Sequence, residues 1–141
     1  MRRTLIALTA VMTLAGCTAE PPPPPAPSTT TSVPGSLADE WDEKFDAALR
    51  TPQPCGPTTA RTQDCADWLT IQVEVVSALS AAIRARDDSS RYSRTLAGIV
   101  KVFQSREAYE ECDDDCWNHA WQVNLGTLAV RTTLRADDQA R

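Results

Sequence analysis

The sequence is poor in the residues from which most catalytic and metal sites are built. It has one histidine, His119, five cysteines and 6% aromatic residues among 141 positions, which leaves little material for a metal cage or an aromatic-rich pocket. No Gly-x-Ser-x-Gly elbow, phosphate-binding loop or dinucleotide-binding glycine fingerprint is present. We therefore predict a chain with no catalytic residues, no cofactor and no metal.

Positive charge is also in short supply. Lysine and arginine total 14 against 19 aspartates and glutamates, which gives a net charge of −5 and a pI near 4.8. An acidic surface repels phosphate backbones and anionic headgroups, so nucleic acid is excluded as an electrostatic partner. The length allows one domain of modest size.

Breakers of regular structure are confined to short stretches. Seven of the ten prolines lie within 21–34 and the other three within 52–57, and Gly98 and Gly126 are the only glycines after residue 57. Long segments without breakers favour helices over a sheet with many turns. Apolar residues at helical spacing place these helices at 37–50, 65–86, 90–111 and 114–136, with Ser36 and Asp64 as N-caps of the first two.

Four amphipathic helices with short connections predict an all-α fold, an antiparallel up-down-up-down bundle over residues 36–141. A three-helix core with the short first helix packed obliquely is the second architecture. The last helix carries two apolar rows and is expected to be the most enclosed. The rows are Trp117, Trp121, Leu125, Leu128 and Thr132, and Val123, Thr127, Val130 and Leu134.

Two further features of the helices can each be interpreted in two ways. Gly98 and Gly126 mark either a close helix crossing or tolerated substitutions. The tryptophans serve either as core anchors or as the lining of a groove or contact surface. These four are Trp41, Trp68, Trp117 and Trp121.

The N-terminus has the layout of a bacterial export signal. Arg2 and Arg3 precede an apolar stretch from Leu5 to Ala15, which would rise only about 16 Å as a helix and is too short to span a bilayer. The sequence Leu14-Ala15-Gly16-Cys17 that follows resembles the lipobox of bacterial lipoproteins. The resemblance implies that residues 1–16 are removed and that Cys17 carries diacylglycerol and often an amide-linked acyl chain, such as palmitate. The chain is then anchored to the extracytoplasmic face of the cell membrane.

Residues 17–35 have the composition of a tether. They hold seven prolines, with serines and threonines between them. Such a segment is expected to be disordered or in the polyproline II conformation, which at ~3.1 Å per residue can reach about 50 Å from the membrane.

Four cysteines remain when Cys17 is set aside. An even number outside the cytoplasm predicts two disulfides, with three possible pairings of Cys55, Cys65, Cys112 and Cys116. We favour bridges between the two hairpins, because their loops lie at the same end of an antiparallel bundle. On a continuous helix, moreover, the side chains of Cys112 and Cys116 are too far apart to bond. The local pairing of Cys55 with Cys65 and Cys112 with Cys116 stays open if the last helix starts late.

Some side chains could carry chemistry, and each has a plainer interpretation. On one helix face Cys112, Cys116 and His119 could bind zinc, whereas oxidised cysteines would leave only an acidic helix start. Glu107 and Gln72 could line a small pocket or be satisfied core groups. Two carboxylate pairs, Asp87-Asp88 and Asp137-Asp138, are expected to be solvated at helix ends.

These observations favour a lipid-anchored, non-catalytic binding or interaction module at the cell surface, whose partner is an envelope protein or surface ligand. The alternative is a helical carrier or sensor of a small apolar ligand. A prophage-type superinfection-exclusion lipoprotein and a hydrolase with a carboxylate pair are less favoured.

Overall fold

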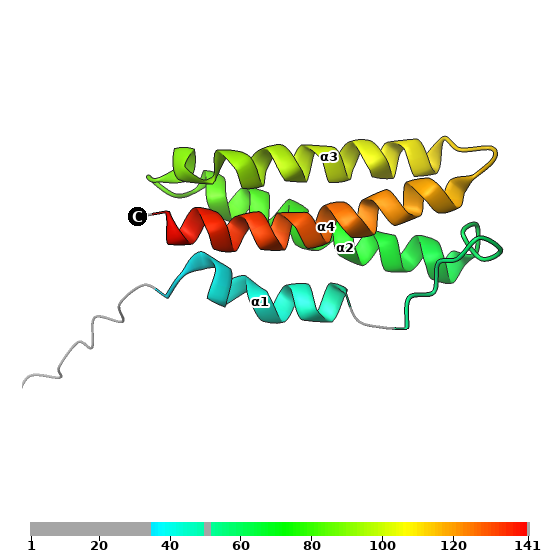
Figure 1. Cartoon of the computed structure of the whole chain (residues 1–141), viewed down its shortest axis with the longest axis horizontal. Coiled ribbons are helices and arrows are strands. Elements are labelled where there is room, and N and C mark those ends of the chain that lie inside the picture. The colour runs from blue at the N-terminus through cyan, green and yellow to red at the C-terminus, as the bar shows by residue number, and fades with distance from the viewer. Residues whose placement is uncertain (1–34, 50–51, 141) are drawn as a thin grey trace, which may run out of the picture. The chain divides into compact units, whose positions relative to one another are not determined.

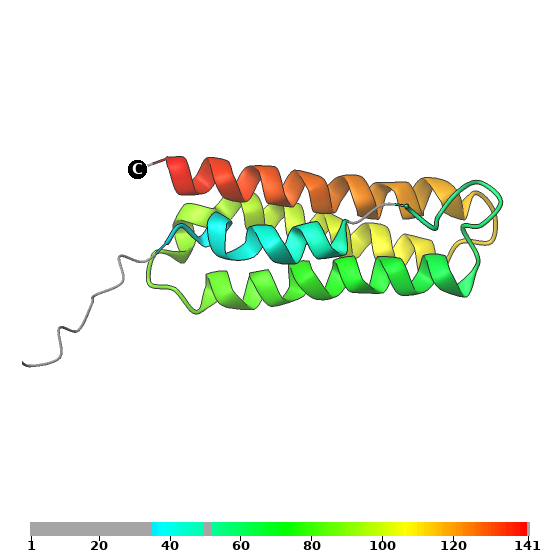
Figure 2. The same cartoon turned by 90° about the horizontal axis from the view of Figure 1, so that it is seen from below.

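The computed structural model describes residues 35–49 and 52–140, and its regular elements there are all helical. They are α1 (Leu37–Ala48), α2 (Gln63–Arg84), the short 3-10 helix η1 (Ser89–Tyr92), α3 (Ser93–Glu110) and α4 (Cys116–Gln139). Figures 1 and 2 show the four α-helices side by side along one axis, with each connection reversing the chain. The predicted antiparallel bundle is confirmed. Cys17, the lipobox and the tether up to residue 34 lie outside the described residues.

The helix starts follow from capping, with one difference from the prediction. The Ser36 side chain accepts a hydrogen bond from the Asp39 backbone N–H at 3.1 Å, as expected of an N-cap. Asp64 is not the cap of α2. The cap is Thr62, whose hydroxyl accepts from the Cys65 N–H at 3.3 Å, so α2 begins two residues earlier than the apolar pattern indicates.

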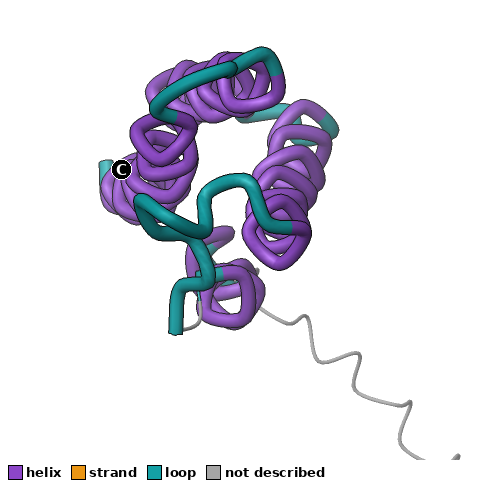
Figure 3. The backbone as a smooth tube through the Cα atoms, turned by 90° about the vertical axis from the view of Figure 1, so that its right-hand side faces the viewer, coloured by secondary structure: helices purple, strands orange, loops and turns teal. Residues whose placement is uncertain are grey.

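The core is filled by side chains from all four helices. Figure 3 shows the helices arranged around a common interior. α1 joins it through Leu37, Trp41 and Phe45, so the first helix is a full member of the bundle rather than an oblique accessory. The other fully buried apolar side chains come from α2, η1, α3 and α4. The largest are Leu69, Val76, Leu79, Ile83, Tyr92, Ile99, Val102, Val123, Val130 and Leu134.

Helical spacing in the sequence predicts an inner face of α3 made of Tyr92, Leu96, Ile99, Val100 and Phe103, and the structure shows that face rotated. Tyr92 and Ile99 are buried as predicted, but Val100 and Phe103 are exposed. The buried row runs instead through Thr95, Ile99 and Val102, because the side that packs against α4 takes residues next to Gly98.

α2 is long and apolar enough, by length and composition alone, to cross a membrane. In this fold Leu69, Val76, Leu79 and Ile83 of that helix are each fully buried within the bundle. The core thereby uses part of its apolar character, since 33% of the apolar window is buried.

Gly98 and Gly126 mark a reciprocal close contact between α3 and α4. A β-carbon on Gly126 would stand 2.8 Å from Cγ2 of Val102, and one on Gly98 would stand 3.2 Å from Cγ2 of Val130. Each glycine therefore faces a valine of the other helix. Of the two interpretations, the close crossing is the one that the structure supports.

Replacing Gly126 by alanine is expected to lower the free energy of unfolding by about 1–2 kcal/mol, even though alanine favours helix by about 1 kcal/mol. The new methyl group would overlap Val102, which is fully buried and branched and has little freedom to move. Urea unfolding followed by tryptophan fluorescence measures the change. Gly98→Ala is the matched control, because its 3.2 Å contact needs a much smaller shift. Equal effects of the two substitutions would contradict this packing.

Candidate binding surface

Helix α4 presents one apolar row to the core and the other to the surface. Val123, Thr127, Val130 and Leu134 are fully buried. On the opposite side Trp121, Leu125 and Leu128 are 37%, 40% and 41% exposed. We call the positions Trp117, Trp121, Leu125, Leu128 and Thr132 the outer row of α4. α4 has nine buried residues, more than any other helix in the described part of the chain, as expected of the most enclosed helix, but its outer row is not covered.

The outer row stays open because the other helices all cover one side of α4. α3 approaches at Gly126, and α1 is held by ion pairs to Arg131, whose guanidinium lies 3.1 Å from Asp42 and 2.7 Å from Asp46. Arg135 also pairs with Asp42, at 2.6 Å. Hydrogen bonds from Arg135 and Arg131 lower the pKa of Asp42, so the carboxylate is charged throughout the physiological range. The sequence contained a signal for which side of α4 is covered, since Gly126 lies on the side that α3 approaches closely.

Two tryptophans form the N-terminal end of the outer row. The ring centroids of Trp117 and Trp121 are 5.6 Å apart and the planes are tilted by 34°. Trp117 also lines a hollow of about 310 Å³ between the loop at Pro57 and the acidic segment 113–115. Trp41 is instead a core anchor, and Trp68 is half-buried, so the four tryptophans divide between core and surface.

The cysteine pairing that we favoured is wrong. The structure joins Cys55 to Cys65 and Cys112 to Cys116, so that each bond links a loop residue to the first turn of the helix that follows, with Cα–Cα distances of 4.8 and 5.5 Å. The geometric objection to the second bond does not apply, because α4 starts only at Cys116 and Cys112 lies outside it. Asp115, at a φ of 54°, adopts the left-handed conformation that turns the chain between α3 and α4.

The proposed zinc ligands are not available as a set. Cys112 and Cys116 are bonded to each other, and His119 is half-buried one turn into α4. Within 35–49 and 52–140 no three histidine, cysteine, aspartate or glutamate side chains are placed to hold a metal ion. The acidic residues Asp113, Asp114 and Asp115 lie at the surface, immediately before the start of α4.

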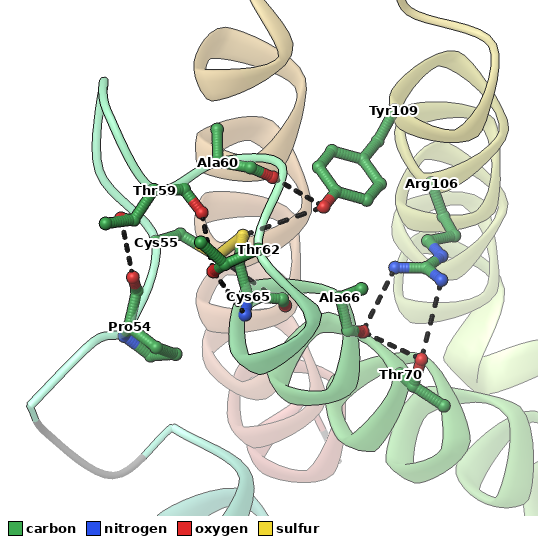
Figure 4. The surroundings of a disulfide bond; sticks show 10 residues. All are labelled: Pro54, Cys55, Thr59, Ala60, Thr62, Cys65, Ala66, Thr70, Arg106 and Tyr109. Atoms are coloured by element: carbon green, nitrogen blue, oxygen red, sulfur yellow. Dashed lines mark hydrogen bonds between the residues drawn. A yellow bond between two sulfur atoms is a disulfide. The ribbon is translucent and has the colours of Figure 1, made fainter.

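Both disulfide loops are fastened to the neighbouring helices. The Tyr109 hydroxyl donates to the Ala60 carbonyl at 2.6 Å and lies 3.8 Å from the sulfur of Cys65 (Figure 4). Arg61 reaches across to the second disulfide, since its guanidinium donates to the carbonyl of Cys112 and lies 3.3 Å from the sulfur of Cys116. The two local bridges thereby support one shared end of the bundle.

The opposite end is closed by two buried aspartates that sequence reasoning placed in solvent. Asp137 and Asp138 are 1% and 8% exposed, although Asp87 and Asp88 do remain at or near the surface. The Asp138 carboxylate accepts from the Ala38 N–H and from the Tyr92 hydroxyl, both at 2.6 Å. It therefore caps the first turn of α1 from the far end of the chain.

Asp137 does the same for α3. Its carboxylate accepts from the backbone N–H of Thr95 at 3.2 Å and from the Thr95 hydroxyl at 2.7 Å, and Arg94 pairs with it at 2.6 Å. Arg91 donates to the backbone carbonyls of both aspartates. Burial and the hydrogen bond to Asp138 raise the pKa of Tyr92 to about 12, so that this phenol remains a donor at neutral pH.

Gln72 and Glu107 do not meet at a site. Glu107 is exposed. Gln72 is completely buried and both polar atoms of its amide lack a hydrogen-bond partner, so it is not a satisfied core group. An apolar groove lies elsewhere, between α1 and α2, with a volume of about 400 Å³. It is lined by Trp41, Lys44, Ala47, Ala48, Ile71, Glu74, Val75 and Ala78.

Comparison with known proteins gives no relative: no protein-family model matches the chain, and no curated protein or solved structure is significantly similar to it.

Proposed function

We propose that the chain is a lipid-anchored, non-catalytic binding module held at the extracytoplasmic face of the cell membrane. The signal-like N-terminus and the sequence around Cys17 support the anchor. The two disulfides support the compartment, because such bonds persist where thiols are not kept reduced.

The observation that carries the binding role is the outer row of α4. Large apolar side chains at 37–41% exposure follow one another along a single helix of a bundle whose core is already filled. A row of exposed apolar side chains, unlike single scattered ones, is a candidate interaction site. Tryptophan, which occupies two positions of the row, is also the residue type that most often anchors an interface.

The fold presents this row along the length of the domain. The tether joins the bundle at α1, whose first turn is held to the C-terminal end of α4 by the contact between Ala38 and Asp138. The row therefore begins at the disulfide-braced end, far from the attachment point, and runs back toward it along α4. With a tether of up to about 50 Å the whole row is accessible above a membrane.

Photo-crosslinking in intact bacteria tests the role of the outer row. The full chain is expressed with a benzophenone amino acid in place of Gln122, which is exposed beside the row. We expect a light-dependent adduct that the substitution Leu125→Glu reduces at least tenfold, because a carboxylate in the row opposes burial. Ile71→Glu is the matched control, since Ile71 is an equally large apolar residue, 48% exposed, on a different face. Absence of any adduct, or equal loss in both variants, would contradict the proposal.

A carrier of a small apolar ligand is the second candidate, and the groove between α1 and α2 is what favours it. Its volume of about 400 Å³ suits a ligand of modest size. Saturable binding of an apolar fluorescent probe that Ile71→Glu abolishes and Leu125→Glu leaves unchanged would support the carrier. Failure of the probe to bind would remove it.

A further inference from the structure

We propose that the partner of the outer row is a second copy of this chain, paired through α4 in antiparallel orientation. This inference rests on the proposed binding role of the same surface and adds the identity of what covers it.

The spacing of the row is that of a helix–helix seam. Trp121, Leu125, Leu128 and Thr132 follow at intervals of four, three and four residues, which is the pattern of the two core positions in a coiled coil. The other apolar row of α4 is buried in the bundle, so the seam faces away from the domain's own core. A surface helix that only completes a bundle does not need a second seam.

The row is complementary to itself when two copies run in opposite directions. Leu125 then lies opposite Leu128 of the second copy, and Trp121 lies opposite Thr132 of the second copy, so that a bulky side chain meets a small one. The row is centred close to the middle of α4, so antiparallel pairing overlaps nearly the whole of this 24-residue helix. A two-fold axis would relate the copies, as in most homodimers.

Charge sets the orientation. Asp113, Asp114 and Asp115 immediately precede α4 and are all exposed. Parallel pairing would place the two acidic runs side by side, whereas antiparallel pairing separates them by about 36 Å, the length of the helix. That separation is several times the screening length of roughly 8 Å at physiological salt, so the repulsion is removed.

The flanks of the row permit close approach. On the side toward α3, positions 122, 129 and 136 are Gln, Ala and Ala, and all three are exposed and uncharged. On the side toward α1, Arg131 and Arg135 are neutralised by their pairs with Asp42 and Asp46. A charged partner or an anionic lipid surface finds no matching charge along this face, but an identical helix fits it.

Membrane attachment makes so small a surface sufficient. The three large exposed side chains offer on the order of 200 Å² of apolar area, well below the roughly 800 Å² per partner of a stable dimer. Copies confined to one membrane by their tethers meet at a far higher effective concentration than free chains do. A tether of about 50 Å against a bundle of about 36 Å lets two anchored copies lie antiparallel.

The crosslinking experiment distinguishes the partner when two differently tagged full chains are expressed together, both with the benzophenone at position 122. We expect an adduct of twice the mass of the processed chain that carries both tags. Peptide mapping should place its second attachment near residue 131, which lies opposite position 122 in the antiparallel register. Leu125→Glu in both chains should reduce this adduct at least tenfold, and Ile71→Glu should leave it unchanged.

The other outcomes separate the two proposals. Attachment near residue 122 of the second chain would overturn the antiparallel arrangement. An adduct with a different protein or with lipid, in place of the doubly tagged product, would overturn pairing between copies and leave α4 as a binding surface. No adduct of any kind would overturn both.

Discussion

Replacing Asp138 by alanine is expected to lower the free energy of unfolding by about 3–4 kcal/mol, the largest effect of any single substitution considered. The change removes two hydrogen bonds to a charged acceptor, one from the first turn of α1 and one from the Tyr92 hydroxyl. It also leaves that hydroxyl buried without a partner, since Tyr92 is 1% exposed. Urea unfolding of residues 18–141, monitored by tryptophan fluorescence and circular dichroism, gives the free energy.

The control for Asp138 is another aspartate at the same end of the bundle. Asp88 pairs with Arg86 and Arg91 at the surface, where ion pairs contribute little, so Asp88→Ala should leave the free energy of unfolding nearly unchanged. Tyr92→Phe should fall between the two, because it removes one of the two bonds. A loss below about 1 kcal/mol for Asp138→Ala would show that this carboxylate does not hold α1 in place.

Removing the disulfide between Cys55 and Cys65 by replacing both with alanine is expected to cost about 3 kcal/mol. Closing a 10-residue loop accounts for most of this in the chain-entropy description, and both half-cystines are buried. The corresponding double substitution at Cys112 and Cys116, which closes a shorter loop, should cost about 2 kcal/mol. The same unfolding measurement applies to both.

Thiol titration of these two double variants checks the pairing independently of stability. With local bridges each denatured variant of residues 18–141 has no free thiol, because the remaining two cysteines are still bonded to each other. Bridges between the hairpins would leave two free thiols in each variant. Finding those thiols would contradict the structure.

The fold could be predicted because residues that break helices are nearly absent from the sequence after residue 57. No proline follows Pro57, and the apolar residues keep a helical period, so the four helices and their antiparallel order follow almost directly. Ser36 was recognisable as a cap from its position and side chain. Helix ends shifted by two or three residues, since α4 begins at Cys116 and ends at Gln139 rather than spanning 114–136.

The remaining errors concern contacts between residues that are distant in the sequence. Two apolar rows on α4 are equally visible in the sequence, but which of them faces the core depends on where α1 and α3 lie. Asp137 and Asp138 look like ordinary charges at a helix end. Only their approach to Ala38, about 100 residues earlier, and to Thr95 makes them caps. The disulfide pairing depended on where α4 starts, which the apolar pattern placed two residues too early.

The intact mass of the chain, extracted from bacterial membranes under non-reducing conditions, shows whether this protein is lipid-anchored and disulfide-bonded. We expect a chain that begins at Cys17 and carries the mass of a diacylglyceryl group, often with a further acyl chain. The mass should also be lower by four hydrogens, two for each disulfide. A chain found in the aqueous fraction with residues 1–16 intact and Cys17 unmodified would contradict this expectation.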